Sequence, residues 1–135
     1  MRKIMILIAM LAITACQGPT GSSAAVQVHE FGIESSISSF EAGIVTLELE
    51  NDGEFGHTLV ITDTGGHVLS AGDVIAPGET SRISVDLAPG KYSFTCRIVA
   101  QDDEGTVIDH YEQGMSAEVL VSAGSANSGA HTDPD

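Results

Sequence analysis

The sequence predicts an all-β domain in which short strands form a sandwich or a barrel. Two observations lead to this expectation. Apolar and polar residues alternate with a period of two in several segments, whereas helical periodicity is hard to find after the N-terminal segment. Turn signals such as "NDG", "TGG", "APGE" and "APGK" recur between these segments. Alternation with one apolar face is typical of half-buried antiparallel strands, and Gly/Pro punctuation of short strands is typical of sandwiches and barrels.

The expected strands follow one another from residue 26 onward. They cover residues 26–31, 44–50, 57–62, 67–70, 81–87, 91–96 and 116–122. In "IVTLELE" the apolar side chains share one face and the polar side chains share the other. In "KYSFTC" Tyr92, Phe94 and Cys96 share a face, so the side chain of Cys96 is expected to point towards the core.

The chain begins "MRKIMILIAMLAITAC", in which a basic start precedes an apolar run of about ten residues. This run is shorter than the roughly 20 residues needed to span a bilayer, and it has the flanks of a secretory signal. The small residues before Cys16 resemble the lipobox of bacterial lipoproteins, which implies acylation of Cys16. The alternative is an ordinary signal peptide with an incidental cysteine.

Composition divides the chain into four parts. Residues 1–15 are expected to be a lipoprotein signal peptide and residues 16–25 a flexible tether, because "QGPTGSSAA" is small and polar. Residues 26–122 form the expected domain, which is large enough to bury a core. Residues 123–135 have the composition of a disordered tail.

The chain is strongly acidic, with a formal net charge of −14. This charge argues against binding to nucleic acid or directly to anionic lipid, and it would steer the protein towards a basic partner. The alternative is a solvated acidic surface without a partner.

Cys96 is the only cysteine after Cys16. A leftover cysteine in an exported protein can be a buried inert thiol, half of an intermolecular disulfide or a metal ligand, and all three remain open on this observation.

Thirteen residues separate Cys96 from His110. "RIVA" and "TVID" are strand-like and "QDDEG" between them is turn-like, so we expect a β-hairpin insert that returns the chain to its starting point. The alternative is a disordered acidic loop. The expected cross-strand pairs are Ala100–Thr106, Val99–Val107, Ile98–Ile108, Arg97–Asp109 and Cys96–His110.

The chain resembles the cupredoxins, the blue-copper proteins, over about residues 26–122. The resemblance is carried by "VTLELENDGEFGHTLVI", "LAPGKYSFTC" and "HYEQGMSAEVLV", which place a histidine, a cysteine, a second histidine and a methionine in the family's order. It implies a Greek-key β-sandwich with one type 1 copper site. The implied ligands are His57, Cys96, His110 and Met115. Two histidines, a thiolate and a weak axial thioether hold copper in a geometry that serves both of its oxidation states.

Two features depart from the family pattern. Most members have only a few residues between the cysteine and the second histidine. Many also carry an asparagine directly after the first histidine, where it braces the copper loops; here that residue is Thr58, which is expected to bond less extensively. The remaining histidines, His29, His67 and His131, are expected to be structural or solvated.

The expected function is electron transfer by a membrane-tethered blue-copper protein of the cell envelope, lipid-anchored on the outer side of the cytoplasmic membrane or in the periplasm. Its expected partner is a redox protein such as a basic cytochrome. The alternatives are copper delivery or sequestration, against which the single methionine of the mature chain argues, and a copper-free binding module. No enzyme activity is expected, because the chain has no His-x-His cluster, nucleophile motif or phosphate-binding glycine loop.

Overall fold

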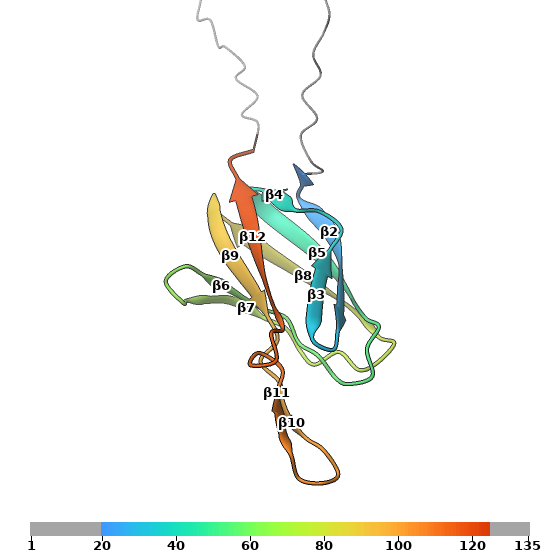
Figure 1. The fold of residues 1–135 in the computed structure, drawn as a ribbon. Helices are drawn as coiled ribbons and strands as arrows, with labels where there is room; N and C mark the ends of the chain where they lie inside the picture. Colours follow the sequence, from blue (N-terminus) through green and yellow to red (C-terminus); the bar gives the residue numbers. More distant parts are fainter. Residues whose placement is uncertain (1–19, 125–135) are drawn as a thin grey trace, which may run out of the picture.

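The computed structural model describes residues 20–124. Within this range the regular structure consists of strands alone, arranged as a β-sandwich (Figure 1). One sheet has the strand order β1-β4-β12-β9-β6-β7 and the other β3-β2-β5-β8, while β10 and β11 form a separate pair. No helix in this part of the chain is long and apolar enough to cross a membrane.

All the predicted strand segments contain a strand. The six-stranded sheet consists of β1 (Thr20–Gly21), β4 (Ser39–Glu41), β6 (Val60–Asp63), β7 (Val68–Ala71), β9 (Gly90–Thr95) and β12 (Ser116–Ser122). The four-stranded sheet consists of β2 (Ser23–His29), β3 (Gly32–Ser35), β5 (Gly43–Asn51) and β8 (Thr80–Leu87). The short strands β1, β3 and β4 were not predicted, because their apolar residues are too few to show a period.

The expectation of antiparallel pairing is wrong for several strand pairs. β2 pairs in parallel with β5, and β4 pairs in parallel with both β1 and β12. Parallel neighbours need a long connection, and β3 and β4 supply it between the end of β2 and the start of β5. Alternation along one strand reports which face is buried but contains nothing about the direction of the neighbouring strand.

The sheet also begins earlier than expected. β1, which pairs with β4, and the start of β2 at Ser23 both lie inside the segment expected to be a tether. Ala24 of β2 is buried and pairs with Leu47 of β5. Alanine is too small to mark the strand face clearly in the sequence. The predicted signal peptide (1–15), Cys16 and residues 125–135 of the predicted tail lie outside the described residues.

The core lies between the inner faces of the two sheets. Phe40 of β4 and Phe94 of β9 are fully buried, with ring centroids 6.1 Å apart. The predicted face of β9 is confirmed, since Tyr92, Phe94 and the following Cys96 are all buried. Alternating inner and outer residues are the normal way in which two packed sheets form a core.

The predicted insert is a hairpin of β10 (Val99–Gln101) and β11 (Val107–Asp109), which projects from the end of the sandwich opposite the last residues of β12 (Figure 1). Its predicted register is wrong. The observed pairs are Val99–Asp109, Ala100–Ile108 and Gln101–Val107.

The loop explains this shift. The side chain of Asp102 accepts hydrogen bonds from the backbone N–H groups of Glu104 and Thr106, at 3.0 and 2.7 Å, which centres the turn one residue later than expected. Gly105 adopts a φ of +87°, a conformation that favours glycine. The predicted Arg97–Asp109 pair is therefore absent. Instead, the guanidinium of Arg97 lies 3.8 Å from the centre of the Tyr111 ring.

Candidate metal centre

Three of the predicted site residues meet at the end of the sandwich from which the hairpin projects. The Sγ of Cys96 lies 3.9 Å from Nδ1 of His57 and 3.6 Å from Nδ1 of His110. One ligand atom from each of the three residues falls within 4.8 Å of the other two. All three side chains are buried. A buried thiol and two imidazole nitrogens at this spacing can close around a single metal ion.

Backbone pairing fixes each of these residues. Cys96 directly follows β9. His57 lies in the connection between β5 and β6 and forms an isolated bridge with Ile75, with N···O distances of 3.1 and 2.7 Å. His110 directly follows β11, and its N–H donates to the carbonyl of Ile98 at 3.0 Å. The predicted direct pairing of Cys96 with His110 is wrong, but the two side chains still meet.

Backbone hydrogen bonds join Met115 to Cys96 and His110. Its N–H donates to the carbonyl of His110 at 3.0 Å, and its carbonyl accepts a hydrogen bond from the N–H of Cys96 at 3.2 Å. The side chain is fully buried. A compact turn over residues 110–115 thus holds the backbone of Met115 against Cys96 and His110, with its side chain in the interior.

Aromatic rings surround His110. Its ring centroid lies 5.0 Å from that of His57. The rings of Phe31 and Phe55 pack against it in T-shaped geometry, with centroids 5.4 and 6.4 Å away. His110 is 1% exposed, whereas Phe55 is 48% exposed. Phe55 therefore forms the outer wall of the centre next to the hairpin.

The pKa of His110 is shifted in the direction that favours the neutral ring. Burial lowers its pKa below the usual value of 6.5, and the nearby His57 lowers it further. A neutral imidazole keeps a lone pair free for a metal, whereas a protonated one does not. The charge state of this histidine therefore suits coordination.

Glu30 contacts the outer nitrogen of His57. Its Oε1 lies 2.9 Å from His57 Nε2 and also accepts hydrogen bonds from the N–H groups of Glu54 and Phe55, at 2.9 and 2.8 Å. Burial disfavours ionisation of this carboxyl, but the hydrogen bonds from Phe55, Glu54 and His57 outweigh that effect and lower its pKa to about 2. An ionised carboxylate requires a donor from Nε2 of His57, so in the neutral ring the lone pair is on Nδ1, the nitrogen that faces Cys96.

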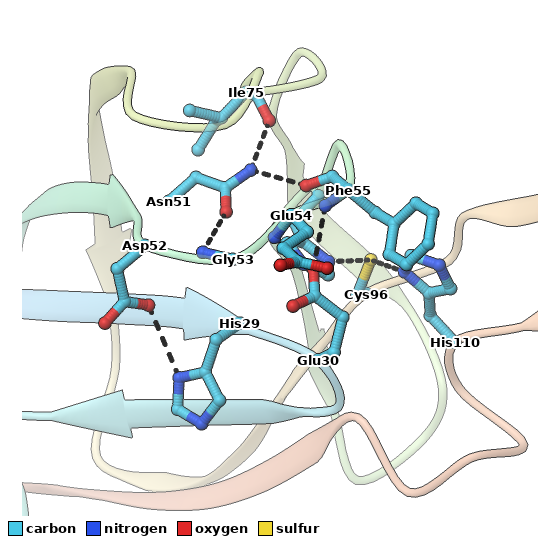
Figure 2. A network of polar contacts seen from close by, with 11 residues as sticks. His29, Glu30, Asn51, Asp52, Gly53, Glu54, Phe55, Ile75, Cys96 and His110 are labelled. Atoms are coloured by element: carbon cyan, nitrogen blue, oxygen red, sulfur yellow. Dashed lines mark hydrogen bonds and ion pairs between the residues drawn. The ribbon is translucent and has the colours of Figure 1, made fainter.

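Asn51 stabilises the loop that carries Glu54 and Phe55. Its Nδ2 donates to the carbonyls of Phe55 and Ile75, both at 2.8 Å, and its Oδ1 accepts a hydrogen bond from the N–H of Gly53 at 2.9 Å (Figure 2). Asn51 is fully buried. The side chain thereby ties the loop before His57 to the bridge partner of His57.

The other residues considered from sequence lie apart from the metal centre or outside the described residues. The hydroxyl of Thr58 donates to the carbonyl of Gly72 at 2.7 Å, a single brace where many family members have an asparagine. His29 lies 3.5 Å from a carboxylate oxygen of Asp52, and exposed His67 lies 3.0 Å from one of Asp63. His131 lies outside the described residues.

Sequence reasoning missed Glu30 and Asn51. Asn51 carries a weak signal, since it is a polar residue on the buried side of an otherwise alternating strand. Glu30 carries none, because an acidic residue at a strand end is ordinarily solvated. Both act through contacts with residues more than twenty positions away, or with loops whose conformation the sequence pattern does not specify.

The geometry defines a class of protein: a β-sandwich with a buried cluster of two histidines and one cysteine at one end, and a methionine beside it. These residues match the donor set of a type 1 copper site. The chain belongs to the cupredoxin family, because the family profile described as "Cupredoxin-like domain" matches residues 3–108. The matched segment ends before His110 and Met115, so their place in the centre comes from the structure.

Solved structures share the fold. Auracyanin from Roseiflexus castenholzii has a TM-score of 0.58 at 19% identity, covering 75% of this chain and 97% of its own. Auracyanin A, a "blue" copper protein from Chloroflexus aurantiacus, has a TM-score of 0.58 at 13% identity, covering 76% and 99%. Rusticyanin from Thiobacillus ferrooxidans has a TM-score of 0.53 at 16% identity, covering 76% and 80%. A comparison with curated proteins finds no match.

Proposed function

We propose that this protein is a one-copper electron carrier. The proposed ligands are Nδ1 of His57, Sγ of Cys96 and Nδ1 of His110, with the thioether of Met115 as the weak axial ligand. The observation that supports this most strongly is the convergence of three buried donor atoms within 4.8 Å of one another. A trigonal His₂Cys set with a distant methionine is typical of sites that transfer single electrons.

The surroundings of the ligands favour fast electron exchange. Copper bound there would supply the Cu(I)/Cu(II) couple. The chain contributes ligands that are already close together and fixed by backbone hydrogen bonds, so little has to rearrange when the charge changes. The sulfur lies in a buried environment, which modulates the reduction potential of such a site.

The route for the electron would pass through His110. Its ring lies beneath Phe55, and a small hollow lined by Phe55, Ala100, Ile108 and His110 opens beside the hairpin. Val107 on the hairpin is 65% exposed, so the hairpin presents apolar surface as well as Gln101 and Asp102, the polar residues that also line the hollow. A partner that docks there would approach the copper more closely than at the faces of the sheets.

The proposed partner is a basic redox protein, such as a cytochrome. Asp102, Asp103 and Glu104 lie in the hairpin loop, where carboxylates could steer a positively charged surface towards the end of the sandwich. The rate of electron transfer should then fall as ionic strength rises, because salt screens exposed charges. The proposed location is the cell envelope, with the protein anchored by a lipid on Cys16.

A copper titration tests the proposed function. We would use the full chain carrying Cys16→Ser, in which Cys96 is the only cysteine. One equivalent of Cu(II) should give an intense visible thiolate-to-copper absorption band and a mononuclear EPR signal. Adding Cys96→Ala should abolish the band, and the fully reduced protein should lose its colour.

Two other outcomes of the titration would favour other functions. Tight binding of Cu(I) without the visible band would favour copper delivery or sequestration. Failure to bind either ion would contradict a copper function and leave a partner-binding sandwich. Radiolabelled palmitate incorporated into the wild-type chain but not into Cys16→Ser would support the proposed anchor.

A further inference from the structure

We propose that Glu30 is a positioning residue that fixes the tautomer of His57 and, through its negative charge, favours the higher oxidation state of the bound metal. This inference rests on the proposed function, since it assigns a role towards the same copper. Glu30 would not itself touch the metal, because it contacts the nitrogen of His57 that faces away from Cys96.

The two nitrogens of His57 have opposite environments. Nδ1 faces the sulfur of Cys96 at 3.9 Å, and Nε2 faces Oε1 of Glu30 at 2.9 Å. A carboxylate accepts hydrogen bonds only, so Nε2 must carry the proton. In the neutral ring the lone pair is then on Nδ1, inside the cluster, where a metal ion would need it.

Glu30 cannot easily leave this position. Its Oε1 accepts hydrogen bonds from two consecutive backbone N–H groups, of Glu54 and Phe55, in addition to that from His57. Gly53 lies so close to the carboxylate that a Cβ at that position would overlap it. Because the same loop is tied down by Asn51, the carboxylate is fixed relative to His57 by the backbone rather than by solvent-exposed side chains.

The negative charge has a predictable effect on the metal. A carboxylate on the outer nitrogen makes an imidazole a stronger donor, and groups of this kind typically change metal affinity by about 10–100-fold when removed. Stronger donation stabilises Cu(II) more than Cu(I). The side chain of Glu30 is 23% exposed, so water screens part of the charge, and we expect the lower end of that range.

Two substitutions at this position separate the charge from the hydrogen bond. Glu30→Gln retains an acceptor oxygen for the loop and for His57 but removes the charge. Glu30→Ala removes both. Thr46→Ala serves as the control, because it removes an exposed hydrogen bond to the hydroxyl of Ser84 without changing any charge.

The first measurement is the ratio of Cu(II) to Cu(I) affinity in the full chain carrying Cys16→Ser. Glu30→Gln should lower the ratio about tenfold, equal to a potential raised by about 59 mV for one electron. Thr46→Ala should leave the ratio unchanged. An unchanged ratio in Glu30→Gln, even with lowered stability, would overturn the proposal and leave Glu30 as a loop brace.

The second measurement needs no copper. Nitrogen-15 NMR of the metal-free protein should show His57 protonated at Nε2 and bare at Nδ1, and Glu30→Ala should lose this preference. The same tautomer in wild type and Glu30→Ala would overturn the proposal. If the wild type bound no copper, the proposed electron-transfer function would be wrong. The NMR measurement would still decide whether Glu30 fixes the tautomer of His57.

Discussion

The sulfur of Cys96 lies 3.6 Å from Nδ1 of His110, although thirteen residues separate them in the sequence. The two are brought together because the chain leaves and returns at one point: the N–H of His110 donates to the carbonyl of Ile98 at 3.0 Å. The base of the β10–β11 hairpin therefore lies at the centre. The hairpin lengthens the chain between Cys96 and His110 without increasing the distance between their side chains.

This geometry predicts that the hairpin can be removed without loss of the centre. A hydrogen bond from one N–H to the carbonyl three residues earlier closes a β-turn. Replacing residues 99–109 with Asn-Gly would make Ile98 and His110 the ends of such a turn, a sequence that suits two-residue hairpins. The shortened protein should bind one copper and keep the visible absorption band.

The same variant tests docking. Electron exchange with a basic cytochrome should become slower and less dependent on salt, because the hairpin carboxylates are gone. Exchange with a small inorganic complex provides the control and should be little changed. Loss of the absorption band in a folded variant would mean that the hairpin maintains the copper site directly.

Asn51 should be a major determinant of stability near the centre. In Asn51→Ala, the carbonyl of Phe55 and the N–H of Gly53 would lose this partner, and the carbonyl of Ile75 would keep only the N–H of His57. Unsatisfied buried groups cost about 1–3 kcal/mol, so the free energy of unfolding of the metal-free protein should fall by about that amount. Urea denaturation followed by circular dichroism measures it.

Thr46→Ala is the control for this comparison. It removes an exposed hydrogen bond between the hydroxyls of Thr46 and Ser84, and should change the free energy of unfolding by no more than about 0.5 kcal/mol. If Asn51→Ala lowered the free energy of unfolding no more than Thr46→Ala does, the hydrogen bonds of Asn51 would not be what stabilises the loop.

Gly53→Ala should displace Glu30. The added methyl group would overlap the carboxylate of Glu30, which can swing towards solvent only by giving up its hydrogen bonds. We expect a loss of about 1–3 kcal/mol in stability and a change in copper affinity ratio like that of Glu30→Gln. Gly124→Ala is the control, because a Cβ there meets nothing within 4 Å. A normal affinity ratio in Gly53→Ala, with Glu30 displaced in its crystal structure, would contradict this account.

The stability of the metal-free protein should depend on pH through Glu30. Its pKa is about 2 in the folded protein, below the ordinary value of 4.5, so on acidification the unfolded chain takes up the proton first. The contribution of Glu30 to the free energy of unfolding is fully present above pH 4.5 and is lost as the pH falls to about 2. The stability difference between wild type and Glu30→Gln should shrink over that range, as measured by urea denaturation. A difference that stayed constant would show that the charge of Glu30 contributes nothing to folding.

The sequence by itself determined the strand content, the buried face of β9 and the order of His57, Cys96, His110 and Met115. These features are local, since alternation identifies the inner face of a strand and residue types limit which metal can bind. It also predicted the hairpin, because two strand-like segments flank a turn-like one. The hairpin register was missed by two residues, since it depends on how the side chain of Asp102 caps the turn.

Only the tertiary structure decided what surrounds the ligands. The parallel pairing of β2 with β5 brings the end of β2, and with it Glu30, next to the loop after β5. Asn51 reaches the carbonyl of Ile75, twenty-four residues away, because the segment of Ile75 forms a bridge with His57 beside the end of β5. Such contacts depend on the relative placement of distant segments, and each involves one polar side chain in a strand or loop. No local period specifies that placement, so it is set only when the two sheets pack.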